Sequence, residues 1–181
     1  HLSPTKNPRL IMKTITIIVS KGAILGNIEG PRQVFTEANS FLERMGQQPM
    51  FKIQLAGLSE KSQLNDGLYT ISTESINKIE KSDLVIIPAM YGDLGEAIEK
   101  NKEFIPWIIK QYHEGSEVAS LCLGAFLLAS TGLLNEKQCA THWLAANTFR
   151  KMFPDINLVE DKIITDENGI EYLDLYSGHG V

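Results

Sequence analysis

Cysteine and basic residues are both scarce in this sequence. Its 181 residues include only two cysteines, Cys122 and Cys139, which are too few for a disulfide framework. Lys and Arg total 17 against 22 Asp and Glu, so the formal net charge is −5. A surface that binds nucleic acid needs a basic face, and no cluster of Lys or Arg provides one. The sequence therefore predicts a cytoplasmic domain that does not itself bind nucleic acid.

Long apolar runs, internal repeats, low-complexity tracts and interdomain linkers are also missing. No stretch approaches the length of a transmembrane helix, and the first residues, HLSPTKNPRL, are polar with two prolines rather than a secretion signal. We expect residues 1–12 to be a tag or disordered arm, with Met12 as a candidate native start. Residues 13–181 are expected to form one domain, because a chain of this length with 43% hydrophobic residues can bury a single core.

Motifs for metals and nucleotides are absent as well. The histidines His113, His142 and His179 and the two cysteines include no ligand pair at zinc spacing, which argues against a structural metal. The glycine-rich segment GAILGNIEG lacks both the GxGxxG spacing and a P-loop lysine. No metal and no cofactor is expected.

Buried strands alternate with helices along most of the chain. Residues 13–19, 50–56 and 83–88 are rich in β-branched and apolar residues, as in strands that are covered on both faces. Helices are predicted over residues 31–45 and 96–113. The first would begin at Pro31 and turn one apolar stripe to the core, formed by Val34, Phe35, Ala38, Phe41, Leu42 and Met45.

Turns and short strands complete the prediction. Asn65, Asp66 and Gly67 indicate a hairpin, and a second hairpin is expected around residues 166–169. The alternation of strands and helices predicts an α/β sandwich around a mainly parallel sheet. Ligands of such folds bind beyond the carboxyl ends of the strands, where Asn27, Gly92 and Cys122 are expected to converge.

The segment EVASLCLGAFLLAST, residues 117–131, is predicted to turn directly from a buried strand into a helix, with Cys122 at the turn. A thiol at the start of a helix lies against unpaired amide groups, which favour the thiolate. Gly124 would leave room for the sharp turn. The alternative is a small apolar core cysteine, because cysteine outside disulfides is often buried.

A nucleophilic cysteine needs a partner group and donors for a developing oxyanion. His142 is the candidate partner, since it precedes a predicted helix 20 residues after Cys122; alternatively it is only a helix cap. The backbone amides of Leu123 and Gly92 are candidate oxyanion donors. Tyr91 and Trp143 are candidate pocket residues, although aromatic residues at such positions also serve in core or rim packing.

Several segments, taken in order, resemble the ThiJ/PfpI branch of the class I glutamine amidotransferase-like superfamily. These are DLVIIPAMYGD, the long helix with PWI, SLCLGAFLLASTGLL, ATHWLAANTFRKMFP and the hairpin around TDENG. The THW segment and the following FP are most similar to the amidotransferase-like amino-terminal domain of AraC-type transcriptional regulators. The resemblance implies a flavodoxin-like three-layer sandwich, often homodimeric, with Cys122 at the nucleophile elbow and His142 beside it.

The sequence departs from this family at two polar positions. Enzymes of the family carry an acidic residue four positions before the proline of a GP pair, where this chain has Asn27. A carboxamide cannot exchange a proton as a carboxylate does, and Glu29 would have to be re-aimed to replace it. Leu123 stands where hydratase-like members have a hydroxyl residue, which predicts a less polar pocket.

The final residues, YSGHGV, resemble the turn that precedes the last helix of the family, so the domain is expected to be truncated at its carboxyl end. The leading hypothesis is a ligand-sensing or dimerising domain of an AraC-type regulator with vestigial catalysis. DNA would be bound only through a separate carboxyl-terminal domain. The alternatives are a stand-alone enzyme, such as a hydratase, glyoxalase-like enzyme or amidase, and a redox-sensitive thiol protein in which Cys122 is oxidised to a sulfinate.

Overall fold

The computed structural model describes residues 11–160, 162, 164–166 and 169–173. The predicted amino-terminal arm falls almost entirely, and the expected truncated end entirely, outside these residues. No helix in this part of the chain has both the length and the apolar character that crossing a membrane requires.

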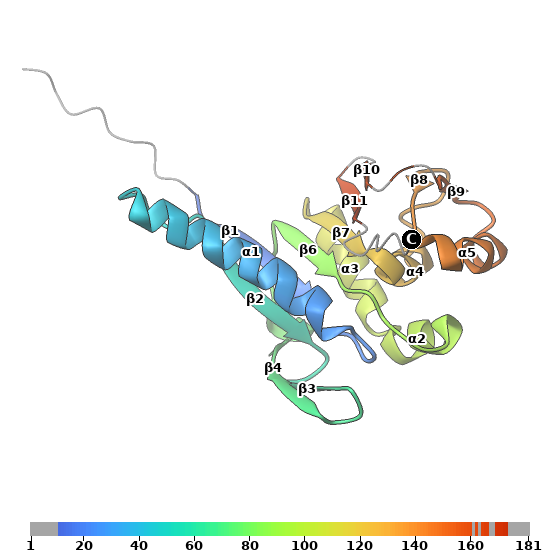
Figure 1. The fold of residues 1–181 in the computed structure, drawn as a ribbon, viewed down its shortest axis with the longest axis horizontal. Coiled ribbons are helices and arrows are strands. Elements are labelled where there is room, and N and C mark those ends of the chain that lie inside the picture. Colours follow the sequence, from blue (N-terminus) through green and yellow to red (C-terminus); the bar gives the residue numbers. More distant parts are fainter. Residues whose placement is uncertain (1–10, 161, 163, 167–168, 174–181) are drawn as a thin grey trace, which may run out of the picture.

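A seven-stranded sheet forms the centre of the described structure (Figure 1). Its neighbouring strands run parallel except at one edge, where β10 is antiparallel to β11. The prediction of a mainly parallel sheet in a flavodoxin-like α/β fold is thus confirmed. In spatial order the strands are β10 (Ile164–Asp166), β11 (Ile170–Leu173), β7 (Glu117–Leu121), β6 (Leu84–Ile87), β1 (Lys13–Ile18), β2 (Phe51–Gly57) and β5 (Glu74–Ser75).

Strand β1 lies inside the sheet, as its apolar sequence predicts. Ile15 is in register with Ile53 of β2 on one side and with Leu84 of β6 on the other. Ile17 and Ile18 point to opposite faces, and both are fully buried. Apolar layers therefore cover both faces of this strand.

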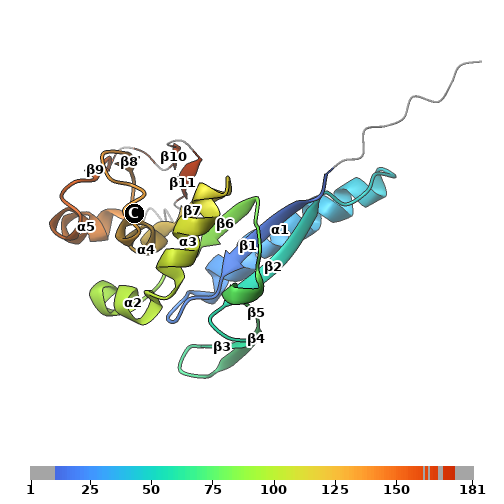
Figure 2. The same ribbon diagram turned by 180° about the vertical axis from the view of Figure 1, so that it is seen from behind.

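Helices lie on both faces of the sheet, which gives the predicted three layers. The two opposite views show α1 on one face and α3 and α4 on the other (Figures 1 and 2). The larger core includes an edge-to-face contact between Phe126 of α4 and Phe149 of α5, whose ring centroids are 5.0 Å apart. The helices are α1 (Leu25–Arg44), α2 (Leu94–Asn101), α3 (Phe104–His113), α4 (Ala125–Ser130) and α5 (Ala146–Met152).

Short strands and turns complete the described structure. The predicted hairpin at Asn65 is present as β3 (Lys61–Leu64) and β4 (Tyr69–Ser72), and the second predicted hairpin is β10–β11. A separate two-stranded sheet joins β8 (Gln138–Cys139) to β9 (Asn157–Leu158). The 3-10 turns are η1 (Ile76–Lys78), η2 (Cys122–Gly124) and η3 (Trp143–Ala145).

The predicted start of the first long helix is wrong. Helix α1 begins at Leu25, and Pro31 lies inside it. Tertiary contacts hold the additional turns: Ile28 is buried, and the amide of Ile24 donates a hydrogen bond to the carbonyl of Ala89, 2.9 Å away. These contacts outweigh the low helix propensity of the glycine-containing segment.

The expected inward stripe of α1 is also only partly correct. Phe35 packs edge to face on Phe51, with ring centroids 5.0 Å apart. Val34, Phe41 and Met45 are instead more than half exposed. Helix α1 covers the sheet with a narrower face than its apolar pattern indicates, which leaves an apolar stripe on the surface.

An ion pair joins the starts of β1 and β6 and predicts a modest acid sensitivity. Lys13 Nζ donates to Asp83 Oδ1 over 2.8 Å, and the Thr14 amide donates to Asp83 Oδ2 over 2.8 Å. The Lys13 hydrogen bond, aided by the Thr14 amide, lowers the pKa of Asp83. Its contribution to stability is therefore present above the unfolded pKa of about 3.9 and is lost as pH falls through the lower folded value.

The Asp83→Asn variant is expected to show a smaller loss of stability on acidification than the wild type. The difference should shrink in high salt, because both side chains are partly exposed. Urea unfolding between pH 3 and pH 7 measures it. Parallel pH profiles of the two proteins would contradict the assignment.

Candidate functional site

Cys122 occupies the predicted turn between β7 and a helix. Strand β7 ends at Leu121, the turn η2 begins at Cys122, and α4 follows. Cys122 is buried, and its φ of +51° lies in the left-handed region that few residues other than glycine adopt. Such strained backbone is enriched at functional sites. The nucleophilic role of the thiol remains a prediction.

Gly124 is required by the close approach of this turn to β6. A Cβ atom at this position would lie 2.5 Å from the carbonyl oxygen of Ile87 and 2.8 Å from that of Pro88. Both contacts are far shorter than van der Waals separation and involve backbone. The absence of a side chain at Gly124 therefore allows the cysteine turn to pack against the end of β6.

The segment after β6 also contacts the loop after β1. Asn27 is almost fully buried, and its Oδ1 accepts a hydrogen bond from the amide of Ala89 over 3.2 Å. The amide of Tyr91 donates to the carbonyl of Gly22 over 3.0 Å. The carboxamide thus fixes the chain beside β6. Asn27 and the cysteine turn therefore both contact the chain at the end of β6, and Gly92 follows that part of the chain.

His142 makes local contacts. Its Nδ1 accepts a hydrogen bond from the amide of Leu144 over 3.3 Å, so the side chain caps η3. The imidazole also stacks on the ring of Trp143, with centroids 5.8 Å apart. Strand β8, which leads to His142, pairs with β9 outside the central sheet. The structure thus shows the capping role, and the partnership with Cys122 stays a prediction.

The remaining predicted pocket residues, Glu29, Trp143 and Leu123, have different surroundings. Glu29 is exposed and pairs with Arg32 over 2.6 Å, and this hydrogen bond lowers the pKa of Glu29. Glu29 therefore does not take the place of a carboxylate at position 27. Trp143 is 68% exposed. Leu123 packs at the edge of the larger core.

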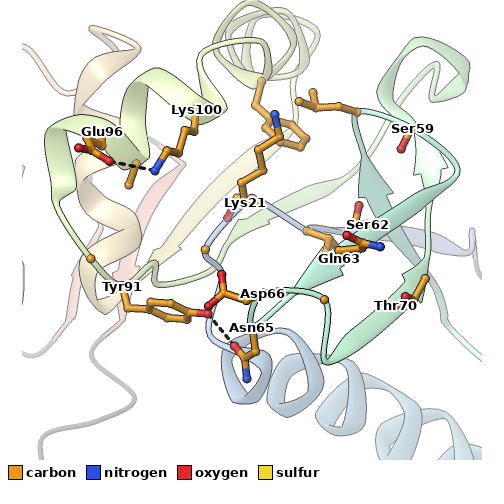
Figure 3. A pocket seen from close by; sticks show the side chains of 18 of the residues that line it. Lys21, Ser59, Ser62, Gln63, Asn65, Asp66, Thr70, Tyr91, Glu96 and Lys100 are labelled. Atoms are coloured by element: carbon orange, nitrogen blue, oxygen red, sulfur yellow. Dashed lines mark hydrogen bonds and ion pairs between the residues drawn. The ribbon is translucent and has the colours of Figure 1, made fainter.

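Tyr91 and Gly92 line a cavity of about 770 Å³ at the carboxyl edge of β1 and β6. The Tyr91 hydroxyl donates to Oδ1 of Asn65 over 2.7 Å, which joins the segment after β6 to the β3–β4 hairpin (Figure 3). Gly92 has a φ of +94°. The residues that line this cavity do not include Cys122, Asn27 or His142.

Sequence reasoning missed a buried residue that organises this edge. Asn101, at the end of α2, accepts from the Lys21 amide over 2.8 Å and donates to the Lys21 carbonyl over 2.9 Å. It also donates to the carbonyl of Ala97, 2.9 Å away. An asparagine within the apolar pattern of a predicted helix could have pointed to this role, because a buried side-chain amide requires hydrogen-bond partners.

Cys139 provides an internal reference for thiol reactivity. Burial raises its pKa to about 12, and neither cysteine forms a disulfide. At pH 8 about one Cys139 thiol in ten thousand is ionised. We expect native Cys139 to resist iodoacetamide at pH 8 and to react in 6 M guanidinium chloride at an ordinary rate, as measured by mass spectrometry of tryptic peptides. Rapid alkylation in the native state would contradict its burial.

In the described residues, no group of three or more His, Cys, Asp or Glu side chains is arranged to hold a metal ion.

Comparisons with known proteins agree with this architecture. The chain is 22% identical over 117 residues to the HTH-type transcriptional regulator CdhR of Pseudomonas aeruginosa, covering 61% of this chain and 34% of CdhR. It is 28% identical over 147 residues to an uncharacterised protein from the cpoL 5′ region of Streptomyces lividans, covering 77% of this chain and 94% of that protein. The chain thus spans about a third of the length of the regulator.

A solved structure shows the same fold in a regulator. The AraC family transcriptional regulator from Pseudomonas putida superimposes with a TM-score of 0.67 at 15% identity, covering 89% of this chain and 83% of that chain. The model of the DJ-1/PfpI family matches residues 13–171, which contain the central sheet and the cysteine turn. The chain belongs to the DJ-1/PfpI family.

Proposed function

We propose that the chain is a ligand-sensing and dimerising domain of an AraC-type transcriptional regulator, in which catalysis is vestigial. Its match to part of an HTH-type regulator supports this role, as does the fold that it shares with an AraC family protein. DNA would be bound by a separate carboxyl-terminal domain, and the protein would act in the cytoplasm. Cys122 and His142 would line the small-molecule crevice.

The observation that carries the loss of catalysis is the burial of Asn27. By the family resemblance Asn27 takes the position of the acid, and in the structure its Oδ1 accepts a hydrogen bond from the Ala89 amide. A carboxamide has no proton to exchange near neutral pH, so general acid–base chemistry lacks its usual group. Glu29 is bound to Arg32 on the surface and does not replace it.

Dimerisation has a candidate surface on α1. Val34, Phe41 and Met45 follow one another at helical spacing, and each is more than half exposed. A second copy of the chain would cover this stripe and remove it from water.

The turnover of a small electrophile tests the vestigial site. We expect the protein to consume methylglyoxal no faster than its Cys122→Ser variant, because the proton-transfer group is missing. The measurement is loss of methylglyoxal over time, with thiol addition separated from turnover by using substrate in large excess. Multiple turnovers that depend on Cys122 would contradict the proposal.

Sequence reading of the gene beyond codon 181 tests the regulator role, which requires two helix-turn-helix patterns there.

A stand-alone cysteine enzyme is the second candidate, and the positive φ of Cys122 favours it. In that case Cys122 would be the nucleophile, and the amides of Leu123 and Gly92 would bind the oxyanion. This candidate requires the pH midpoint of Cys122 alkylation to lie well below the value of about 8.5 for an ordinary thiol, and to rise in His142→Ala.

A further inference from the structure

The cavity lined by Tyr91 and Gly92 is bounded by three parts of the chain: the loop after β1, the β3–β4 hairpin and the start of α2. We call it the hairpin pocket. Figure 3 shows the Lys21 side chain between Lys100 of α2 and the hairpin residues Ser62 and Gln63. The polar residues that line it from the loop after β1 and from the hairpin side include Ser20, Lys21, Ser59, Lys61, Ser62 and Gln63.

Basic groups in the hairpin pocket are available for an anion. Lys100 is paired with Glu96 over 2.9 Å, whereas Lys21 and Lys61 form no ion pair with any residue that the structure describes. Asp93 already caps α2 by accepting the Glu96 amide over 2.9 Å. Glu96 is thus balanced by Lys100, and Asp93 keeps its negative charge while it caps α2, whereas Lys21 and Lys61 are not balanced by an ion pair within the described residues.

Asp66 is the other carboxylate of the lining. Figure 3 shows it at the rim beside Tyr91, with the Lys21 side chain extending away from it. The end of the pocket reached by the Lys21 side chain is therefore the part suited to a negative group.

A buried hydroxyl in the pocket wall lacks a partner. Ser20 lies two residues after the end of β1 and is fully buried, and its Oγ has no hydrogen-bond partner in the described part of the chain. Native proteins satisfy nearly all such groups, so this hydroxyl retains hydrogen-bonding capacity next to the pocket. On the hairpin side, Gln63 adds an amide side chain, while the Ser59 hydroxyl donates to the Lys61 carbonyl over 2.7 Å and the Ser62 hydroxyl shares a hydrogen bond with Thr73 over 3.3 Å, so both serines keep acceptor capacity.

The Lys21 backbone is held in place. Asn101 bonds both its amide and its carbonyl, so the lysine is presented from a fixed point between β1 and α2. A preorganised donor loses less conformational entropy on binding than a mobile one.

We propose that the hairpin pocket binds a small polyhydroxylated carboxylate, with Lys21 and Lys61 facing the carboxylate and the serine and glutamine side chains facing the hydroxyl groups. Cys122 does not line this pocket, and the proposal does not depend on the regulatory role. The chemistry fits because unpaired ammonium groups recognise a carboxylate, while hydroxyl and amide side chains both donate and accept hydrogen bonds.

Calorimetric titration of the protein with D-gluconate tests the proposal. D-sorbitol is the neutral comparison with a similar polyol skeleton, and inorganic phosphate is the anion without a polyol. We expect gluconate to bind, sorbitol and phosphate to bind at least tenfold more weakly, and gluconate binding to weaken with salt.

Variants locate the binding. Lys21→Met and Lys61→Met should each weaken gluconate binding roughly tenfold or more, and Ser20→Ala should weaken it to a smaller degree. Lys151→Met, which removes an exposed lysine of α5, should leave it unchanged, and thermal unfolding without ligand checks that each variant folds. The proposal is overturned if gluconate does not bind, if phosphate binds as tightly, or if the two pocket variants match Lys151→Met. The regulator proposal would survive any of these results, because it is tested by the downstream gene.

Discussion

The Gly124→Ala variant is expected to lose about 2–3 kcal/mol of unfolding free energy, because its new methyl group would overlap the backbone of β6. The two nearest atoms are carbonyl oxygens of Ile87 and Pro88, which cannot rotate away as a side chain would. In a chain of this size that loss lowers Tm by about 4–12 °C. Thermal and urea unfolding measure it.

Gly30→Ala provides the matched control. Gly30 lies in α1, and a Cβ there would meet no atom within 4 Å. Its stability should change by less than about 1 kcal/mol. Equal losses in both variants would show that the loss of a glycine, rather than the close approach at β6, governs the effect.

Asn101→Ala is expected to destabilise the protein by about 2–3 kcal/mol, because it removes a fully buried amide and the hydrogen bonds that this amide makes. The Lys21 amide and carbonyl both lose their partner. The variant should therefore lose protection around Lys21 as well as overall stability. Urea unfolding reports the global part, and faster hydrogen exchange at the Lys21 amide reports the local part.

Asn147→Ala controls for the chemistry of the substitution. Asn147 is exposed on α5, so its replacement should change stability by no more than about 0.5 kcal/mol. Unchanged hydrogen exchange at Lys21 in Asn101→Ala would contradict the role of Asn101 in holding this loop.

The central strands and the cysteine turn could be predicted because their signals are local. Strand β1 is an almost unbroken β-branched run, and Cys122 stands between a strand pattern and a helix pattern. The hairpin turn was equally clear, since Asn65, Asp66 and Gly67 all adopt positive φ, as their residue types allow.

The parts that could not be predicted depend on contacts between distant segments. Pro31 marked a helix start by its own chemistry, yet the burial of Ile28 and the bond from Ile24 to Ala89 extend α1 beyond it. Asn101 serves Lys21, which lies 80 positions away in the chain. The helix-cap role of His142 could be offered as an alternative from its place before a predicted helix, but no spacing in the sequence decides between that role and a partnership with Cys122.

The position of β1 within the sheet has a consequence for synthesis on the ribosome. This strand is synthesised before both of its neighbours, β2 and β6, and β6 follows only after the hairpin β3–β4. Until β6 is made, Ile15, Ile17 and Ile18 have no partner strand on the β6 side. Parallel pairing of distant segments is slow, so the unpaired apolar strand is open to aggregation until β6 is made.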